Sequence, residues 1–231
     1  MPAPSSKIGT RRESSLHRAL KFRYSGCNGR IEQVLGDFVC DGITETGEII
    51  EVQTGSFGPL KEKAGKLAAR GPLRIIHPVV LTKYIETYGG DGRLIRKRKS
   101  PRRGSPWDLF QNLLYAPELP LIRGLSIEIA LVDVLEKRIL DGRGSWRRKG
   151  ASIADKELAA WHDSIILKKI RDYRRFIPPA QRETFTTGSL AKEAEISVEL
   201  ARKTLYVLNR LGVVKRIGKE GRAIAYRLPG R

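Results

Sequence analysis

The chain has 231 residues, of which 40% are hydrophobic, so it can form one medium-sized domain or two small ones, each with its own core. Its formal net charge of +19 favours a polyanionic partner, either nucleic acid or an acidic membrane surface. Two cysteines without CxxC spacing exclude a disulfide scaffold and a zinc site of that type. No apolar run reaches the roughly 20 residues that span a bilayer. We therefore expect a cytoplasmic, nucleoid-associated protein without a membrane partner, in which residues 1–12 form a flexible basic tail lacking a secretory signal.

Residues 13–85 are expected to form a mixed α/β core, in which helices flank a mixed sheet. Apolar residues recur with helical spacing in two stretches, and extended stretches lie between them. Gly71 and Pro72 stop the second helix, and the continuous apolar run that follows is typical of a strand buried on both faces. The expected elements are a helix at 13–24, strands at 31–43 and 48–54, a helix at 57–69 and a strand at 73–81.

The most informative residues lie in a predicted hairpin at 41–53. A three-residue turn with Gly47 in the left-handed conformation would pair Asp41 with Glu51 across the hairpin. Opposed residues point to the same side of a sheet, and Gln53, two residues beyond Glu51, shares that side. We therefore expect one face to carry both acids and the amide. The face turned to the core is expected to carry Cys40, Ile50 and Val52.

Two carboxylates held close together repel one another, and a divalent cation relieves that repulsion. Mg²⁺ prefers one or two carboxylates together with water and phosphate oxygens, and it can activate a water that attacks a phosphate. Asp41 and Glu51 are therefore candidate ligands for Mg²⁺ or Mn²⁺. The alternative interpretation is a polar strand face whose two acids simply point into solvent.

This pattern resembles the PD-(D/E)XK nuclease superfamily, in which an Asp precedes Glu-x-Lys on a hairpin and a helix follows. The resemblance covers residues 13–85 and implies a restriction-endonuclease-like core with a metal-dependent nuclease site. Asp41 matches the first acid and Glu51 the second. Gln53 stands where the family usually has lysine, as it does in some restriction endonucleases and in CoiA-like competence nucleases. The source of the missing positive charge is therefore open.

Lys63 is a candidate for that charge, because it lies within the apolar stripe of the second predicted helix. A lysine on the packed face of a helix is costly unless its ammonium group reaches a partner, and the hairpin carboxylates would be one. Extension of the side chain to solvent is the alternative. Glu13 on the first helix corresponds loosely to an acid that many superfamily members carry there, so we include it among the catalytic candidates.

Two basic segments follow the core. Residues 93–103 are expected to form an exposed basic loop, and residues 141–150 a basic turn. Trp146 in that turn would either stack on a base or anchor local packing. The residues of these segments expected to contact DNA are Arg96, Lys97, Arg98, Lys99, Arg102, Arg103, Trp146, Arg147, Arg148 and Lys149.

The first domain is expected to extend over residues 13–150, with a short helix at 106–115 and a β-rich stretch at 125–140. From residue 151 the apolar spacing favours a helix over 153–176. Residues 151–182 are therefore expected to form a helical connector to the last segment.

Residues 183–231 resemble a small α+β winged helix-turn-helix domain, with a helix at 187–196, a second helix from 198 to about 211 and two strands. In that family the second helix enters the major groove and the strand hairpin contacts phosphates. Protein contact by this module is the alternative. The residues expected to contact DNA are Arg202, Lys203, Tyr206, Arg210, Lys215, Arg216, Lys219 and Arg222.

The function expected from these features is a metal-dependent DNA endonuclease acting in repair, recombination or the processing of branched DNA. The alternative is a DNA-binding protein without catalysis, either a regulator or an architectural factor with a degenerate nuclease core. A protein–protein adaptor is disfavoured by the charge. Cutting both strands requires two sites, which favours a homodimer. The sequence has no ATP-binding loop, so we expect no nucleotide cofactor.

Overall fold

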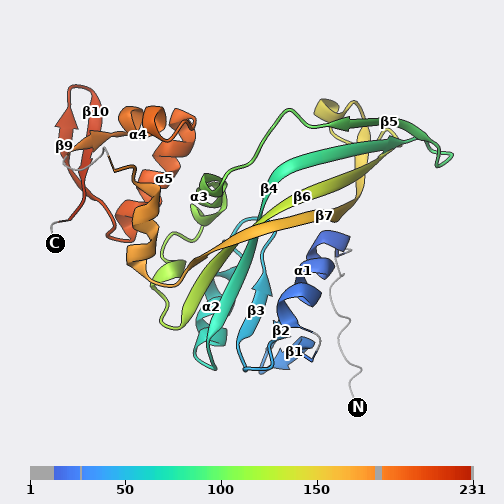
Figure 1. Cartoon of the computed structure of the whole chain (residues 1–231), viewed down its shortest axis with the longest axis horizontal. Coiled ribbons are helices and arrows are strands. Elements are labelled where there is room, and N and C mark those ends of the chain that lie inside the picture. Colours follow the sequence, from blue (N-terminus) through green and yellow to red (C-terminus); the bar gives the residue numbers. More distant parts are fainter. Residues whose placement is uncertain (1–12, 27, 180–183, 230–231) are drawn as a thin grey trace, which may run out of the picture.

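The computed structural model describes residues 13–26, 28–179 and 184–229, so the predicted tail at 1–12 lies outside the described residues. The fold is a mixed α/β arrangement in which a large sheet is flanked by helices (Figure 1), as the sequence predicts. The helices are α1 (Ser15–Ser25), α2 (Leu60–Ala68), α3 (Leu109–Leu113), α4 (Thr187–Glu193) and α5 (Val198–Arg210). The strands are β1 (Arg30–Leu35), β2 (Phe38–Ile43), β3 (Ile49–Val52), β4 (Leu73–Tyr88), β5 (Leu94–Lys99), β6 (Leu125–Leu140), β7 (Ala151–Leu167), β8 (Phe185–Thr186), β9 (Lys215–Glu220) and β10 (Ala223–Arg227).

The large sheet has seven strands in the order β1-β2-β3-β4-β6-β7, with β5 paired to β4. β3 with β4 and β4 with β6 run parallel, while the other neighbours run antiparallel. The element order α1, β1, β2, β3, α2, β4 agrees with the core predicted for residues 13–85 except at two places. The stretch 31–43, predicted as one strand, forms the two antiparallel strands β1 and β2, and the strand predicted at 73–81 continues to Tyr88. Among the described residues, no helix is long and apolar enough to cross a membrane.

The two faces of the sheet are covered by different helices. Leu16 and Leu20 of α1 pack against Ile50 and Val52 of β3 and against neighbouring strands. The apolar stripe of α2 packs on the other face, in the cluster that contains Ile49. Because successive residues of a strand point to opposite faces, β3 contributes side chains to the hydrophobic clusters on both faces of the sheet. The core around the hairpin is therefore double-sided.

Strands β4, β6 and β7 are 16, 16 and 17 residues long, far longer than their neighbours. The near half of β4 pairs with β3, whereas its far half pairs with β5 on the same edge. The far halves therefore project beyond the helices as an extension of the sheet (Figure 1). We call residues 82–99 and 133–158 the arm.

The prediction of a helix over 153–176 is wrong. β7 occupies Ala151–Leu167 and pairs with β6, and a 3-10 helix, η4 (Ile170–Phe176), follows. The register shifts three times, and the first two shifts pair Trp161 with Val132 and Leu158 with Val134. Each bulge adds a residue to β7. The apolar residues are thus spaced as in a helix although the chain is extended.

The prediction of a basic loop at 93–103 is also wrong over most of its length. Residues Leu94–Lys99 form β5, in antiparallel register with β4. Arg96 lies opposite Thr87, and Arg98 lies opposite Ile85. The charged residues are therefore divided between two faces of a sheet, which a flexible loop would not do.

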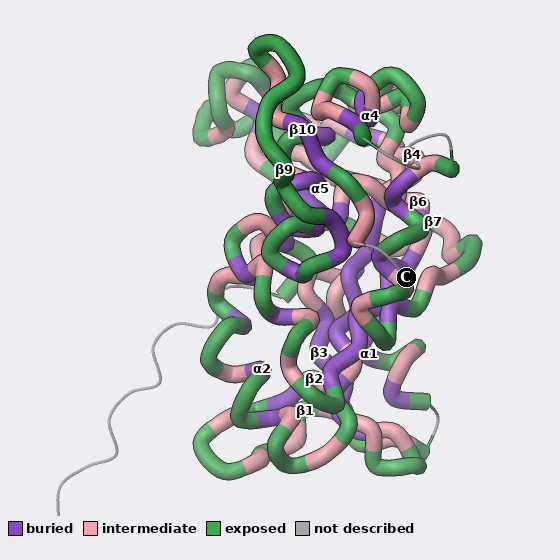
Figure 2. Tube along the Cα trace, turned by 90° about the vertical axis from the view of Figure 1, so that its left-hand side faces the viewer, coloured by how far each residue is buried: buried purple, intermediate pink, exposed green. Residues whose placement is uncertain are grey.

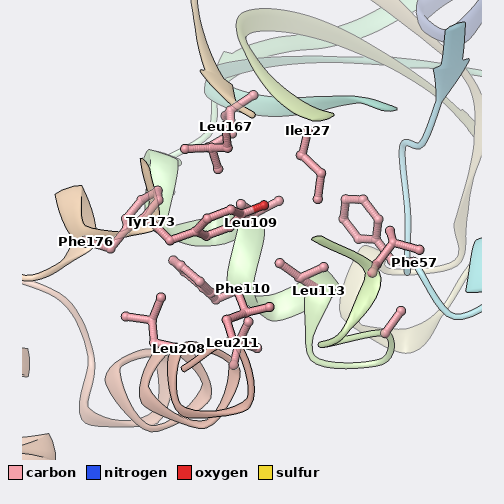
Figure 3. Close-up of a cluster of buried hydrophobic side chains, with 14 of the residues drawn as sticks. Phe57, Leu109, Phe110, Leu113, Ile127, Leu167, Tyr173, Phe176, Leu208 and Leu211 are labelled. Atoms are coloured by element: carbon pink, nitrogen blue, oxygen red, sulfur yellow. The ribbon is translucent and has the colours of Figure 1, made fainter. Parts of the chain in front are cut away.

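The C-terminal helices and strands pack onto the large sheet through a shared hydrophobic core. The small sheet has the order β8-β10-β9. Phe110 of α3, Tyr173 and Phe176 of η4 and Leu208 of α5 lie in one cluster with sheet residues (Figure 3). The ring centroids of Phe110 and Phe176 are 4.8 Å apart in an edge-on contact. Figure 2 shows buried residues continuing from the large sheet into α5, while β9 is exposed along its length.

Candidate functional site

The hairpin between β2 and β3 has the predicted turn. Gly47 adopts a φ of +82°, and the Thr44 N–H donates to the Glu48 carbonyl at 2.9 Å. Gly42 pairs with Ile50, as the turn requires. Only glycine adopts this left-handed conformation without strain, which explains why the turn is fixed at Gly47.

Asp41, the next residue outward from the turn, lies outside this regular pairing and on the α1 side of the sheet. Its Oδ2 accepts a hydrogen bond from the Val52 N–H at 2.8 Å and lies 3.1 Å from the Nε2 of His17. Its Oδ1 is 3.3 Å from the Nζ of Lys21. Burial opposes ionisation of Asp41, but the contacts with His17 and Val52 outweigh it and lower its pKa. Asp41 is therefore a stabilised carboxylate.

Lys21 is the centre of this group. Its side chain is 8% exposed, and its Nζ lies 2.8 Å from Glu13 and 3.1 Å from Glu32 as well as near Asp41. Burial favours the neutral amine, but the hydrogen bonds to Glu13 and Glu32 prevail and raise the pKa of Lys21. Glu13 thus reaches the hairpin acid only through Lys21 and His17. The sequence signal for Lys21 is its position beside Leu20 on the buried face of α1.

Glu51 lies on the other side of the sheet, facing α2. The Nζ of Lys63 is 2.7 Å from its Oε1, so of the two alternatives for Lys63 the contact with a hairpin carboxylate is the one that the structure shows. The Glu51 side chain is 5% exposed. Burial raises the pKa of Glu51 to about 7, in spite of the attraction of Lys63. This contact does not test the catalytic role predicted for Lys63.

The prediction that Asp41, Glu51 and Gln53 share one face, opposite Cys40, is therefore wrong. Asp41 points toward α1 and Glu51 toward α2, and Cys40 lies in the α2-side cluster. Glu32, on the strand beside Asp41, has a φ of +51°. This left-handed residue interrupts the regular ladder at the level of Asp41, so the alternation counted from Gly47 does not extend to that residue.

Gln53 contacts backbone groups and not the two acids. The side-chain amide of Gln53 donates to the backbone carbonyl of Ser56. The backbone carbonyl oxygen of Gln53 lies 2.6 Å from the Nδ1 of His77. Burial lowers the pKa of His77 to about 4, so this imidazole is neutral near pH 7. Its Nε2 lies 3.3 Å from the amide nitrogen of Asn112. The sequence signal for His77 is a single polar residue within the apolar run at 73–81.

A groove of about 850 Å³ adjoins this region, between α1, the middle of β4 and residues 102–112. Its lining includes Glu13 and His77 together with four cations. The acids of the lining have internal partners: Asp155 accepts from the backbone of Ser15 at 3.0 Å, for example. The cations of the lining are Arg18, Lys83, Arg102 and Lys156.

One side of the arm continues this groove. Val134 packs with Leu16 and Leu20 of α1, so alternate residues of the arm from Val134 onward share the α1 side. We call this side the groove face. The register places Ile85, Arg98 and Glu136 together on it, followed by Thr87, Arg96 and Arg138.

The cations of β5 differ in their partners according to their face. Lys97, on the opposite side, lies 2.9 Å from Glu86, and the ammonium of Lys99 lies 5.8 Å from the centre of the Tyr84 ring. Arg96 and Arg98, on the groove face, have no ion pair within the part of the chain that the structure describes. Of the predicted basic segment, Arg96 and Arg98 therefore lie on the groove face, and Arg102 lines the groove itself. Arg103 is exposed and lies outside the groove lining.

The remaining predicted DNA contacts lie in two separate parts of the molecule, the turn between β6 and β7 and the C-terminal elements (Figure 1). Trp146, Arg147, Arg148 and Lys149 occupy the turn between β6 and β7, at the tip of the arm. The predicted residues of α5 and of the β9–β10 hairpin are largely exposed, but Arg210 forms an ion pair with Glu118. Arg210 is therefore engaged within the protein.

The family described as "Domain of unknown function (DUF8091)" matches residues 14–168, well over half of the chain. The chain belongs to this family. A protein of Treponema pallidum (strain Nichols) described as "Uncharacterized protein" is 30% identical over 220 residues, which cover 95% of this chain and 87% of that protein. No solved structure matches the chain significantly.

The matched residues 14–168 run from α1 to the end of β7. They contain Asp41, Glu51 and Lys63, the cations of the groove face and the tip of the arm. The C-terminal elements α4 to β10 lie beyond them. The β2–β3 hairpin, most of the groove and the arm thus lie within the residues that the family matches.

Proposed function

We propose that this protein binds DNA and that the phosphate backbone lies along the groove face of the arm. The observation that carries the proposal is the contrast between the two faces of β5. Lys97 forms an ion pair with an acid on its own face, whereas Arg96 and Arg98 lie on the groove face without an ion pair in the described residues. Unpaired cations gathered on one face repel each other, and a polyanion removes that repulsion while releasing its own counterions.

Two further cations on the groove face are held in place by a buried acid. Glu136 is 3% exposed, and the Nζ of Lys83 and the Nε of Arg138 lie 3.3 Å and 2.7 Å from its carboxylate. Burial opposes ionisation, but Arg138 and Lys83 lower the pKa of Glu136. One acid thus positions two cations, and the surface keeps a net positive charge. Such positioning lowers the entropy lost when phosphates bind.

We further propose that the C-terminal unit acts as a winged helix-turn-helix. The order α4, turn, α5 and β9–β10 hairpin supports this interpretation, and α5 exposes Arg202 and Tyr206. α5 would enter the major groove of DNA, and the hairpin would contact phosphates. The hairpin residues concerned are Lys215, Arg216, Lys219 and Arg222.

The test compares two double variants that remove the same charge from opposite faces of one strand. Arg96→Gln/Arg98→Gln alters the groove face, and Lys97→Gln/Lys99→Gln is the matched control. We expect the first pair to weaken binding of a short duplex and to reduce the salt slope by about 2, since each lost phosphate contact lowers it by roughly 0.9. Fluorescence anisotropy at several salt concentrations measures both. Equal losses in the two double variants would contradict the proposed face.

Hydrolysis of DNA is a second candidate function. It is favoured by the position of the two acids on neighbouring strands of one hairpin, in the element order that the PD-(D/E)XK resemblance implies. The residues do not fit a ready-made Mg²⁺ site, however. Lys21 and Lys63 already neutralise the two carboxylates. No set of three or more His, Cys, Asp or Glu side chains in the described residues is placed to hold a metal ion.

Cleavage is therefore assayed separately from binding. Linear, flap and four-way junction DNA are incubated with the protein in Mg²⁺ or Mn²⁺, alongside Glu51→Gln and Asp41→Asn. An endonuclease would cut at least one of these substrates, and both variants would bind that substrate without cutting it. If every substrate survives while binding persists, the protein is a DNA-binding factor with a nuclease-like core.

A further inference from the structure

We infer that the turn at the tip of the arm, residues 144–150, binds unpaired bases by stacking them on Trp146. We call these residues the tip turn. The inference rests on the proposed binding of DNA and goes beyond it, because it names single-stranded or distorted DNA as the preferred ligand. It is carried by the exposure of one indole, by the rigid turn that displays it and by the cations around it.

Trp146 differs from the other tryptophans of the chain in its exposure. It is 82% exposed, whereas Trp107 is half-buried with its ring 5.2 Å from that of Phe176, and Trp161 is covered by the guanidinium of Arg23 at 4.0 Å. An exposed indole leaves a large apolar face in water. The π-face of a base covers such a surface whatever its sequence, as in proteins that bind single strands.

The tip turn holds Trp146 outward by a closed set of backbone hydrogen bonds. The Gly144 N–H donates to the Gly150 carbonyl at 2.8 Å, and the Lys149 N–H donates to the Trp146 carbonyl at 2.9 Å. A Cβ at Gly144 would lie 1.8 Å from the Ala151 carbonyl oxygen, so only glycine allows this closure. A turn fixed in this way loses little entropy when a ligand binds its exposed side chain.

One cation lies over the indole, and a second anchors the turn that carries it. The guanidinium of Arg147 lies 5.5 Å from the centre of the Trp146 ring, and the Nε of Arg148 donates to the Ala151 carbonyl at 3.1 Å. The turn follows β6, which carries Arg138 on the groove face. A strand whose phosphates follow the groove face therefore reaches the tip turn, where an aromatic ring and cations match an unstacked nucleotide.

An anionic membrane is the other ligand that the tip would suit, because Leu94, Ile95 and Leu140 are also exposed near it. The continuous line of cations from the groove favours nucleic acid. A flat bilayer could contact the tip of the arm but not the cations along the groove at the same time. The experiment therefore includes vesicles as a separate arm.

The test uses Trp146→Ala, with Trp146→Phe as the conservative variant, in the full chain. Three labelled DNA probes of equal length are titrated by fluorescence anisotropy: a single strand, a duplex with a central mismatched bubble and a perfect duplex. We expect Trp146→Ala to weaken binding of the first two roughly ten-fold, as expected for the loss of one stacked base. Binding of the perfect duplex should change less than two-fold, and phenylalanine should restore most of the affinity. Oligonucleotide should quench tryptophan emission in the wild type and much less in the alanine variant.

The outcomes separate this inference from the proposed function. If Trp146→Ala binds all three probes as the wild type does, while Arg96→Gln/Arg98→Gln weakens them, the stacking inference fails and DNA binding stands. If the wild type binds none of the probes, both fail. If Trp146→Ala loses only the binding of vesicles of phosphatidylcholine and phosphatidylserine, the tip turn is a membrane contact and the inference is overturned.

Discussion

The Nζ of Lys63 lies 2.7 Å from the Oε1 of Glu51, and this ion pair joins α2 to the buried strand β3. Both groups lose water on folding, and each makes the burial of the other tolerable. The free energy of unfolding should therefore fall strongly when one partner is removed and much less when both are removed. This asymmetry distinguishes a structural ion pair from two groups that act independently on a substrate.

We predict that, at a pH above about 8 where Glu51 is ionised, Lys63→Met lowers the free energy of unfolding by about 3–5 kcal/mol, because it leaves the Glu51 carboxylate buried without a counter-ion. The double variant Lys63→Met/Glu51→Gln should recover much of that loss. Urea denaturation followed by circular dichroism measures both. Lys61→Met, on the exposed side of the same helix, is the control and should change stability by less than about 0.5 kcal/mol. Equal effects of Lys61→Met and Lys63→Met would show that the pair has no structural role.

A second prediction concerns pH and the Glu51 carboxyl. Its pKa is about 7 in the folded protein and 4.5 in the unfolded chain, so folding takes up a proton between these values. The stability of the wild type relative to Glu51→Gln should therefore fall as pH rises from 4.5 to 7, by about 3 kcal/mol. The pKa of His77 is lowered to about 4 and has the opposite effect, but it is present in both proteins and cancels in the difference.

The measurement is a set of urea titrations of the wild type and Glu51→Gln across this pH window. The quantity of interest is the difference between the two free energies of unfolding at each pH. A difference that stays constant would mean that Glu51 ionises in the folded protein as readily as in the unfolded chain. A difference that grows in the opposite direction would mean that Lys63 dominates over burial.

Local chemistry explains what could be predicted from the sequence. The order of the core elements follows from periodicity and from the breaks at Gly71 and Pro72. The turn at Gly47 follows from its left-handed backbone, and the reach of Lys63 follows from its place in an apolar stripe. Each of these depends on neighbours in the sequence or on one face of one element.

What could not be predicted depends on interruptions of the regular pattern. The left-handed conformation of Glu32 ends the simple alternation beside Asp41, and bulges in β7 give Leu158 and Trp161 a helical spacing. Neither has a glycine to mark it. Sequence periodicity assumes an unbroken strand, so it fails where a residue is added or a ladder is interrupted. The separation of Asp41 from Glu51 is the consequence for the candidate site.

A third prediction contrasts a buried lysine with an exposed one. Lys21→Met leaves Asp41 without its ammonium partner, and we expect a loss of about 3–5 kcal/mol. Lys66→Met breaks an ion pair with Glu62 whose partners are both largely exposed, so it should leave the free energy of unfolding unchanged within the error of the measurement. Thermal and urea unfolding of both variants at the same pH give the comparison. Similar losses would mean that the Lys21 cluster is as well hydrated as a surface pair.

The final prediction concerns the junction between the large sheet and the C-terminal unit. Phe110 is fully buried, between Phe176 and the helix α5. Phe110→Ala removes a ring from the cluster that both parts share and should lower the free energy of unfolding by about 3–5 kcal/mol. Tyr115→Ala, from the same segment but 63% exposed, is the control and should have little effect.

Because the core is continuous, the wild type should unfold in one cooperative transition. Circular dichroism and tryptophan emission report on different parts of the chain: Trp107 lies beside the shared cluster, and Trp161 lies beside α1. Their unfolding curves should coincide in urea. Two separate midpoints in the wild type would show that the C-terminal unit folds on its own core, and Phe110→Ala would then affect the two transitions unequally. A single midpoint that shifts as a whole in Phe110→Ala would mean that α5 is held to the sheet with the stability of the entire fold.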